Sequence, residues 1–128
     1  MTTLDDRKYT KTHEWVKIED DQVIIGISDH AQEALGDITF IELPVVGEPV
    51  DRGGECGVIE SVKAASDLFA PLSGEIADVN ADLEDHPEAV NDSPYEDGWL
   101  YRITNYDVAE YNELMDADQY EATLEPNE

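Results

Sequence analysis

Lys63 is the residue of this sequence whose type and position best suit covalent chemistry. It is the only lysine after Lys17 in a chain of 128 residues, and its neighbours Val62, Ala64 and Ala65 are small and uncharged. An isolated lysine is usually a solvated surface charge. A lysine amine, with an ordinary pKa of about 10.4, is protonated at neutral pH and is acylated only where an enzyme removes that proton. Once acylated, it loses its charge and becomes a flexible tether.

The other side chains that could react do not form a catalytic or metal-binding pattern in the sequence. Cys56 is the only cysteine, so no internal disulfide forms, and a small apolar side chain on a strand is the expected role. His13, His30 and His86 lack the i, i+4 spacing of a helical zinc pair. The acidic run 116–121 ends on glutamate where a calcium loop needs glycine. We expect no metal site and, without a nucleophile–base pair or phosphate loop, no free-standing enzyme.

The segments around Lys63 predict a β-hairpin over about residues 55–70 with this lysine at its tip. Residues 55–61 are typical of a strand, residues 62–65 sit where the chain must reverse, and residues 66–70 are typical of the return strand. Glycine turns are expected at the base of this hairpin. A rigid hairpin would hold the lysine away from the rest of the protein.

The rest of the chain predicts further short strands and two helical regions in a single domain, residues 1–128, with its core over about 9–124. Strands are expected at 15–18, 23–27, 38–43, 75–80 and 99–104, the last of them buried on both sides. A short helix should begin at an Asp29 N-cap and end at Gly36, and another should begin at an Asp107 capping box, with more helix over 116–124. Residues 81–97, which are acidic and contain two prolines, predict a long loop.

The charge of the chain limits its partners. It carries 32 acidic and 7 basic residues, a formal net charge of −25. This excludes ordinary nucleic-acid binding and argues against anionic membranes, because both require Lys and Arg. No stretch reaches the about 20 apolar residues that span a bilayer, and the N-terminus lacks the pattern of a signal peptide, so we expect a cytoplasmic protein. The acids are spread over the whole chain, which is typical of a halophile, whose salt screens the repulsion.

Several blocks of sequence occur in a distinctive order. Residues 60–67 are ESVKAASD and residues 70–75 are APLSGE. Further blocks are Thr12-His13-Glu14-Trp15, residues 26–32 (GISDHAQ), Leu35-Gly36-Asp37, residues 90–95 (VNDSPY) and Gly98-Trp99-Leu100. Together, over roughly Tyr9 to Leu124, they resemble the H proteins of the glycine cleavage system, a family of lipoyl carriers.

The resemblance implies a fold and a function. The fold is mainly β, a lipoyl/biotinyl-type flattened β-barrel-sandwich hybrid of two small antiparallel sheets with a short internal helix and a C-terminal helix. The cofactor is lipoate, joined by an amide to Lys63. The chain would be a carrier and not an enzyme, because the cofactor does the chemistry. Tethering the cofactor raises its effective concentration at each partner.

The resemblance also implies partners. Lipoyl-Lys63 would take the aminomethyl group of glycine from a pyridoxal-phosphate glycine decarboxylase to a tetrahydrofolate-dependent aminomethyltransferase. Dihydrolipoamide dehydrogenase would reoxidise the resulting dithiol, and a lipoate-attaching enzyme would modify Lys63 in the first place.

The resemblance assigns roles to five further residues. In the family, the loaded arm folds back against the protein, and the matching positions here are Thr12, Glu14 and Asp67. Two carboxylates beside a protonated amine make chemical sense as an ionic pocket; a capping Asp67 and a solvated Glu14 are the alternative. Glu60 and Gly74 match positions that guide the lipoate-attaching enzyme, although Gly74 could equally be a turn glycine. Members often have a histidine where this sequence has Ala34, which puts any arm contact there in question.

Two other carrier types disagree with the residues at the tip, and one further alternative stays open. A lipoyl domain of a 2-oxoacid dehydrogenase typically carries Asp-Lys-Ala at the tip, whereas this chain has Val62-Lys63-Ala64. A biotin carrier would flank the lysine with methionines, and neither neighbour is one. The third alternative is an H-like lipoyl carrier or relay domain that serves other lipoyl-dependent enzymes.

Overall fold

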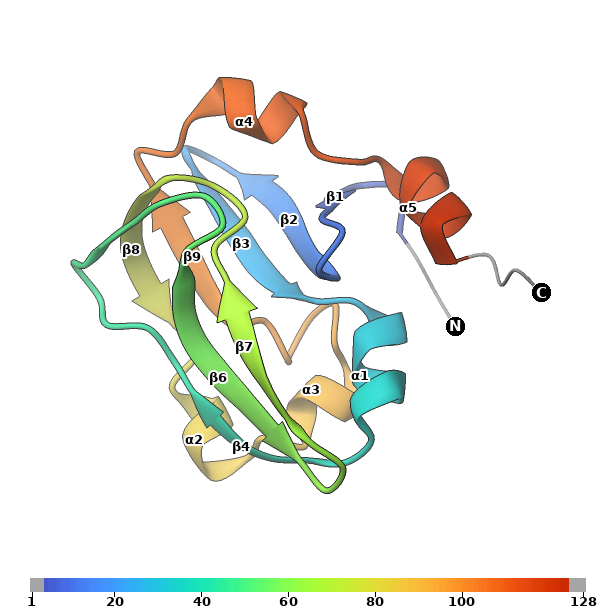
Figure 1. Cartoon of the computed structure of the whole chain (residues 1–128). Coiled ribbons are helices and arrows are strands. Elements are labelled where there is room, and N and C mark those ends of the chain that lie inside the picture. The colour runs from blue at the N-terminus through green and yellow to red at the C-terminus, as the bar shows by residue number, and fades with distance from the viewer. Residues whose placement is uncertain (1–3, 125–128) are drawn as a thin grey trace.

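The structure is a computed structural model that describes residues 4–124, and its strands form two antiparallel sheets. The larger sheet has the order β1-β2-β3-β9-β8-β5, with strands at Lys8–Tyr9, Glu14–Glu19, Gln22–Ile27, Tyr101–Thr104, Gly74–Val79 and Pro49–Val50, respectively. The smaller sheet has the order β4-β6-β7, at Ile38–Glu42, Glu55–Ser61 and Ala65–Phe69. The β6–β7 hairpin lies across the front of the larger sheet in Figure 1. The mainly β fold of two antiparallel sheets, predicted above, is confirmed.

Five short helices connect and cover the sheets. They are α1 (Asp29–Leu35), α2 (Asp82–Asp85), α3 (Ala89–Asp92), α4 (Val108–Asn112) and α5 (Ala117–Leu124). Among the described residues, none of these helices is long and apolar enough to cross a membrane. Helix α1 follows β3 directly and leads into β4, so it connects the larger sheet to the smaller one (Figure 1).

Buried aliphatic side chains fill the space between the sheets. Because side chains alternate along a strand, each strand sends one side inward. The buried residues include Val23, Ile25 and Ile27 from the larger sheet and Ile41, Ile59 and Leu68 from the smaller one. Burial of each such side chain stabilises the fold by about 1.5–3 kcal/mol. This core holds the β6–β7 hairpin on the larger sheet and fixes where its tip points.

A second, mainly aromatic cluster covers the outer face of the larger sheet. The rings of Tyr9 and Tyr120 stack there with centroids 4.6 Å apart, beside the buried Trp15. The partner of Trp15 on β3 is Gly26, where a Cβ atom would lie 2.5 Å from the indole, so only glycine leaves room for the ring. The cluster fixes α5, which carries Tyr120, to strands β1–β3.

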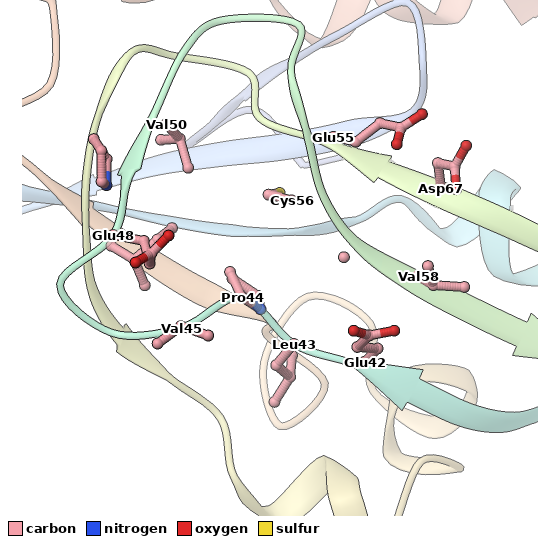
Figure 2. A pocket seen from close by; sticks show the side chains of 13 residues that line it. Glu42, Leu43, Pro44, Val45, Glu48, Val50, Glu55, Cys56, Val58 and Asp67 are labelled. Carbon is pink, nitrogen blue, oxygen red and sulfur yellow. The ribbon is translucent and has the colours of Figure 1, made fainter.

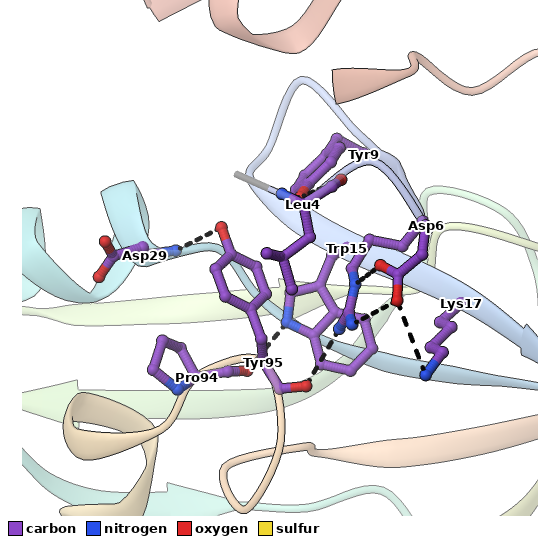
Figure 3. A network of polar contacts seen from close by, with 9 residues as sticks. Leu4, Asp6, Tyr9, Trp15, Lys17, Asp29, Pro94 and Tyr95 are labelled. Carbon is purple, nitrogen blue, oxygen red and sulfur yellow. Dashed lines mark hydrogen bonds and ion pairs between the residues drawn. The ribbon is translucent and has the colours of Figure 1, made fainter. Parts of the chain in front are cut away.

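Arg7 ties the N-terminal segment to the loop after α3, and Figure 3 labels its partners Asp6 and Tyr95. Its guanidinium binds the Asp6 carboxylate through Nε at 2.8 Å and Nη2 at 3.2 Å, and its Nη1 donates to the Tyr95 carbonyl at 3.0 Å. The same guanidinium lies 4.6 Å from the centre of the Trp15 ring. The indole N–H donates to the Pro94 carbonyl at 2.9 Å. Segments far apart in sequence are therefore joined around one tryptophan.

The expectation of a continuous loop over 81–97 is wrong. Helices α2 and α3 lie in this region, and each places one apolar side chain, Leu83 or Val90, in the core. Each helix has only four residues, so no apolar repeat at helical spacing appears in the sequence. The expectation that residues 99–104 are buried on both sides is also wrong. In β9, Tyr101 and Ile103 are fully buried, whereas Arg102 is partly exposed and pairs with Glu19 at 2.9 Å.

Helix α1 begins one residue earlier than predicted. Ser28, and not Asp29, is the N-cap, and its Oγ accepts the N–H of Ala31 at 3.2 Å. Asp29 instead accepts a hydrogen bond from the side chain of Gln32 at 2.7 Å. Gly36 ends the helix as predicted, with a positive φ of 77° that favours glycine.

The second predicted capping box forms only in part. Asp107 caps α4 by accepting the N–H of Ala109 at 2.9 Å. The carboxylate of Glu110 does not return to the cap, and accepts instead from the N–H of Ser73 at 2.7 Å and from its hydroxyl at 3.1 Å. The predicted helix from 107 ends at Asn112, and α5 is a separate helix.

Candidate functional site

The tip of the β6–β7 hairpin presents Lys63 to solvent. Ser61 organises the turn, because its N–H donates to the Ala64 carbonyl at 2.8 Å and its hydroxyl accepts the N–H groups of Lys63 and Ala64, both at 3.2 Å. The N–H of Val62 donates to the Asp37 carbonyl at 3.0 Å, which fixes the tip to the loop between α1 and β4. Side-chain bonds of this kind hold a turn in place without glycine.

The aliphatic stem of Lys63 lies against the end of α1. A Cβ atom added at Gly36 would lie 3.3 Å from Cε and 3.6 Å from Cδ of Lys63. The absence of a side chain at Gly36 therefore leaves room for the lysine stem. This contact was not anticipated, because the sequence explains Gly36 fully as a helix stop.

A pocket of about 200 Å³ borders α1, and we name it the α1 pocket. Its lining residues are Thr12, His13, Glu14, Ile27, His30, Ala31, Ala34, Leu35, Ile59, Ser66, Asp67 and Leu68. The predicted residues Thr12, Glu14 and Asp67 therefore lie around one cavity, although they come from two separate parts of the chain. Leu35, one of the lining residues, is next in sequence to the glycine that the Lys63 stem contacts.

Glu14 is the buried acid of the α1 pocket, with 3% of its surface exposed. Its carboxylate accepts hydrogen bonds from the hydroxyl of Thr10 at 2.6 Å and from the hydroxyl of Thr12. Burial raises the pKa of the Glu14 carboxyl, and the two threonine hydrogen bonds act in the opposite direction. None of the ion pairs within residues 4–124 includes Glu14. The pocket thus contains a buried carboxyl group without a cationic partner from the described chain.

The other polar groups of the α1 pocket differ from Glu14. Asp67 is exposed at the rim. The rings of His13 and His30 lie with centroids 5.0 Å apart. Burial lowers the pKa of His13, and the nearby His30 adds to this effect, so His13 is neutral at pH 7. Ala34 makes the wall apolar where the resemblance implies a histidine.

The two residues predicted to guide a lipoate-attaching enzyme lie apart. Glu60 is exposed on β6, three residues before Lys63. Gly74 opens β8, which belongs to the other sheet. A Cβ atom at Gly74 would lie 2.5 Å from Cγ2 of Ile103 and 2.7 Å from the Thr104 carbonyl oxygen. Close packing against β9 is thus sufficient to explain this glycine.

A second pocket, of about 360 Å³, lies between the β4–β5 loop and β6 (Figure 2). Its lining includes the carboxylates of Glu42, Glu48, Glu55 and Asp67. Cys56 also faces it and donates from Sγ to the Tyr101 hydroxyl at 3.3 Å. Burial raises the pKa of the Cys56 thiol, which keeps it protonated and unreactive. The expected role of Cys56 as a small side chain on a strand agrees with this environment.

A third pocket, of about 540 Å³, shares Thr12 and Glu14 with the α1 pocket. Its walls are largely apolar, with Phe69, Pro71, Leu114 and Met115 among them, and Arg52 pairs with Glu113 in its lining. Sequence reasoning did not find this pocket, because its residues come from four segments that share no motif.

Comparison with known proteins gives a consistent result. The family model described as "Glycine cleavage H-protein" matches residues 7–127. Three relatives are named "Glycine cleavage system H protein". The one from Alcanivorax borkumensis is 52% identical over 92% of each chain, and those from Pectobacterium carotovorum and Thermus thermophilus are 56% and 52% identical over 94% of each chain.

A solved structure agrees with these relatives. The crystal structure of a glycine cleavage system H protein from Mycobacterium marinum superposes with a TM-score of 0.87 at 41% sequence identity, covering 95% of this chain and 98% of that one. At this similarity the lipoyl-domain-like β-sandwich predicted from the sequence is confirmed.

Proposed function

The chain belongs to the glycine cleavage H-protein family, and from this premise we propose that Lys63 is the residue that carries its lipoyl group. Family members hold lipoate covalently on a lysine, and the chain acts as a lipoyl-carrying shuttle of the glycine cleavage system, not as a catalyst. Lys63 is exposed at an ordered turn, and its neighbours in sequence carry no charge. An attaching enzyme can therefore reach the amine.

The surroundings of Lys63 suit a long, largely aliphatic arm. The lysine stem rests on Gly36, and Leu35, Ala34 and Ala31 of α1 continue from there along the α1 pocket. When bound, the lipoyl group supplies a dithiolane whose sulfur accepts the aminomethyl group of glycine. The role of the protein is to lead this arm to a cavity and to shield its end from water.

The observation that best supports a carrier role is the buried Glu14 in the α1 pocket. A carboxyl group out of water favours its charged form when a cation lies nearby. The ammonium of an aminomethyl group on the arm is such a cation. Glu14 holds it with the help of Asp67 at the rim, and Thr12 keeps the Glu14 carboxylate oriented through its hydrogen bond.

The enzymes of the glycine cleavage system are the partners of this carrier. In our proposal, a pyridoxal-phosphate glycine decarboxylase loads the arm, an aminomethyltransferase unloads it, and dihydrolipoamide dehydrogenase reoxidises it. A lipoate-attaching enzyme recognises the tip with the help of Glu60, and a contact at Gly74 stays a prediction. All four would work in the cytoplasm, which also stays a prediction.

Intact mass tests Lys63 directly. The protein is incubated with a lipoate-attaching enzyme, lipoate and ATP, alongside the variants Lys63→Arg and Lys17→Arg. We expect a mass gain of one lipoyl group in the wild type and in Lys17→Arg, and none in Lys63→Arg. A gain in Lys63→Arg would contradict the proposal. A lipoylated protein that glycine decarboxylase does not load would favour a carrier that serves other lipoyl-dependent enzymes.

The acidity of the chain supports a second, separate proposal, that the protein works in concentrated salt. With 32 acids against 7 basic residues, like charges repel across the surface of the folded chain. At molar concentration, salt screens the repulsion between charges that lie more than about 3 Å apart. Urea unfolding in low and in multimolar KCl should therefore give a higher midpoint in high salt. Equal midpoints would remove the argument for a halophilic host.

A further inference from the structure

Tyr120 connects the C-terminal helix to the wall of the α1 pocket. Its side chain is fully buried, and its hydroxyl lies 2.7 Å from Nδ1 of His13 and 2.7 Å from Oγ of Ser28. His13 and Tyr120 are 107 positions apart in sequence. One arrangement satisfies all three groups: Ser28 donates to the Tyr120 oxygen, and Tyr120 donates to Nδ1 of a neutral His13.

Each partner of Tyr120 holds a different wall of the pocket. Ser28 is the N-cap of α1, the helix that supplies Ala31, Ala34 and Leu35 to the lining. His13 stands between Thr12 and Glu14, the polar pair on the opposite wall. A single buried hydroxyl thus bonds to residues of both walls.

The backbone conformation of His13 is strained and is held in place by hydrogen bonds. Its φ of 74° lies in the left-handed region, which costs energy for a residue other than glycine. Its N–H donates to the Thr10 carbonyl at 3.1 Å, and its carbonyl accepts the N–H of Ser28 at 2.9 Å. The hydrogen bond that the ring accepts from the Tyr120 hydroxyl is a third anchor, and its donor lies on the C-terminal helix. The strained turn directs the Thr10 and Thr12 hydroxyls onto the Glu14 carboxylate.

We propose that Tyr120 is a positioning residue of the α1 pocket, which holds α1 and the His13 turn at the separation that encloses the loaded arm. This rests on the proposed role of the α1 pocket in holding the aminomethyl end of the lipoyl arm. Tyr120 is not among the residues that line the pocket. Its effect passes through Ser28 and His13, so removal of its hydroxyl oxygen loosens the pocket while the hairpin tip stays as it is.

Tyr9 provides a matched control. It is also fully buried and stacks on Tyr120, but its hydroxyl bonds to the backbone of Leu4 and to the side chain of Tyr95, whereas the hydroxyl that meets Ser28 and His13 belongs to Tyr120. Tyr9→Phe and Tyr120→Phe each remove one oxygen from the same aromatic stack. General weakening of the stack would affect both variants alike, whereas the hydroxyl that bonds to both Ser28 and His13 is removed only in Tyr120→Phe.

Two measurements test the proposal on full-length protein. The first is amide hydrogen exchange of the unlipoylated chain at Glu14, Ser28 and Ala31. The second is the lifetime of the aminomethyl group on lipoylated protein, loaded from ammonia and formaldehyde onto the reduced arm and followed in the absence of partner enzymes. Glu14→Gln is included as the reference for a pocket that does not hold the amine. His13→Asn tests the link from its other end, because asparagine tolerates a positive φ but its side chain is shorter.

We expect Tyr120→Phe and His13→Asn to raise exchange at Ser28 and Ala31 and to shorten the lifetime by about fivefold, the effect of one buried hydrogen bond. Tyr9→Phe should change neither, and all variants should be lipoylated at the wild-type rate. If Glu14→Gln shortens the lifetime and Tyr120→Phe behaves like Tyr9→Phe, the inference fails while the proposed pocket stands. If Glu14→Gln leaves the lifetime unchanged, the proposed pocket fails and the inference with it.

Discussion

The turn that carries Lys63 is shaped by hydrogen bonds among Ser61, Lys63 and Ala64, which span at most three positions, and one longer-range bond joins Val62 to the Asp37 carbonyl. The α1 pocket, by contrast, draws its walls from β2, β3, α1, β6 and β7. Lys63 is exposed, whereas Glu14 is buried. Covalent attachment needs an accessible amine on a rigid local turn, and protection of the cargo needs a cavity that only several segments can enclose. Changes to the pocket and changes to the tip should therefore have separable effects.

Gly26→Ala should have the largest effect on stability. It should disturb the aromatic cluster that contains Tyr120 and not the hairpin tip. The new Cβ atom would lie 2.5 Å from the Trp15 indole, so the ring or the β2–β3 pair must shift. Overpacking of this kind costs about 1–3 kcal/mol. Urea unfolding should show the loss, while lipoylation of the folded protein at low temperature continues at the wild-type rate. A variant as stable as the wild type would mean that the outer aromatic cluster adjusts freely.

Glu14→Gln should change how stability depends on pH. Burial raises the pKa of Glu14 in the folded chain, so the folded state binds more protons than the unfolded state. The contribution of Glu14 to stability is therefore greatest below its ordinary pKa and falls as the pH rises through the raised value. Subtracting the unfolding free energy of the variant from that of the wild type at each pH should give a difference that declines from acid toward neutral pH. A constant difference would show that Glu14 titrates in the folded chain as it does in water.

Gly36→Ala should disturb the contact between tip and pocket. Its φ of 77° disfavours alanine, and the added Cβ atom would lie 3.3 Å from Cε of Lys63. We expect a loss of about 1 kcal/mol in the free energy of unfolding. Lys63 should still be lipoylated, but the aminomethyl group on the arm should be lost faster because the stem is displaced. Gly47→Ala is the control, since Gly47 has a positive φ of 93° but, among the described residues, no atom within 4 Å of an added Cβ.

Ser61→Ala should have the smallest effect and should act on the tip alone. It removes a hydroxyl that accepts the N–H groups of Lys63 and Ala64. These bonds are exposed to water, so a loss of about 0.5 kcal/mol is expected. The rate of lipoylation should fall while the lifetime of the aminomethyl group on the arm is unchanged. A shorter lifetime of the aminomethyl group with an unchanged rate of lipoylation would contradict the prediction, because it would show that the turn acts on the pocket and not on attachment.

The local elements could be predicted because each depends on short stretches. The β6–β7 hairpin, the position of Lys63 at its tip and the Gly36 stop follow from residue types a few positions apart. The missed elements lack such a signal. Ser28 and Asp29 are adjacent and both suit an N-cap. In the structure Ser28 is the N-cap, and its hydroxyl also lies within hydrogen-bond distance of the Tyr120 hydroxyl. Glu110 could have completed a capping box, but in the folded chain its carboxylate binds Ser73 instead.

The sequence alone determined the strands, the acidic surface and the place of Lys63 at a hairpin tip, because alternation, composition and turn residues act over short distances. The resemblance of its motifs to a known family predicted a pocket formed by Thr12, Glu14 and Asp67. Only the tertiary structure decided that Glu14 is buried without a cationic partner among residues 4–124 and that Tyr120 stands behind the pocket. The reason is physical: burial and the pairing of polar groups depend on how the two sheets and α5 pack, and that packing joins residues that are more than a hundred positions apart.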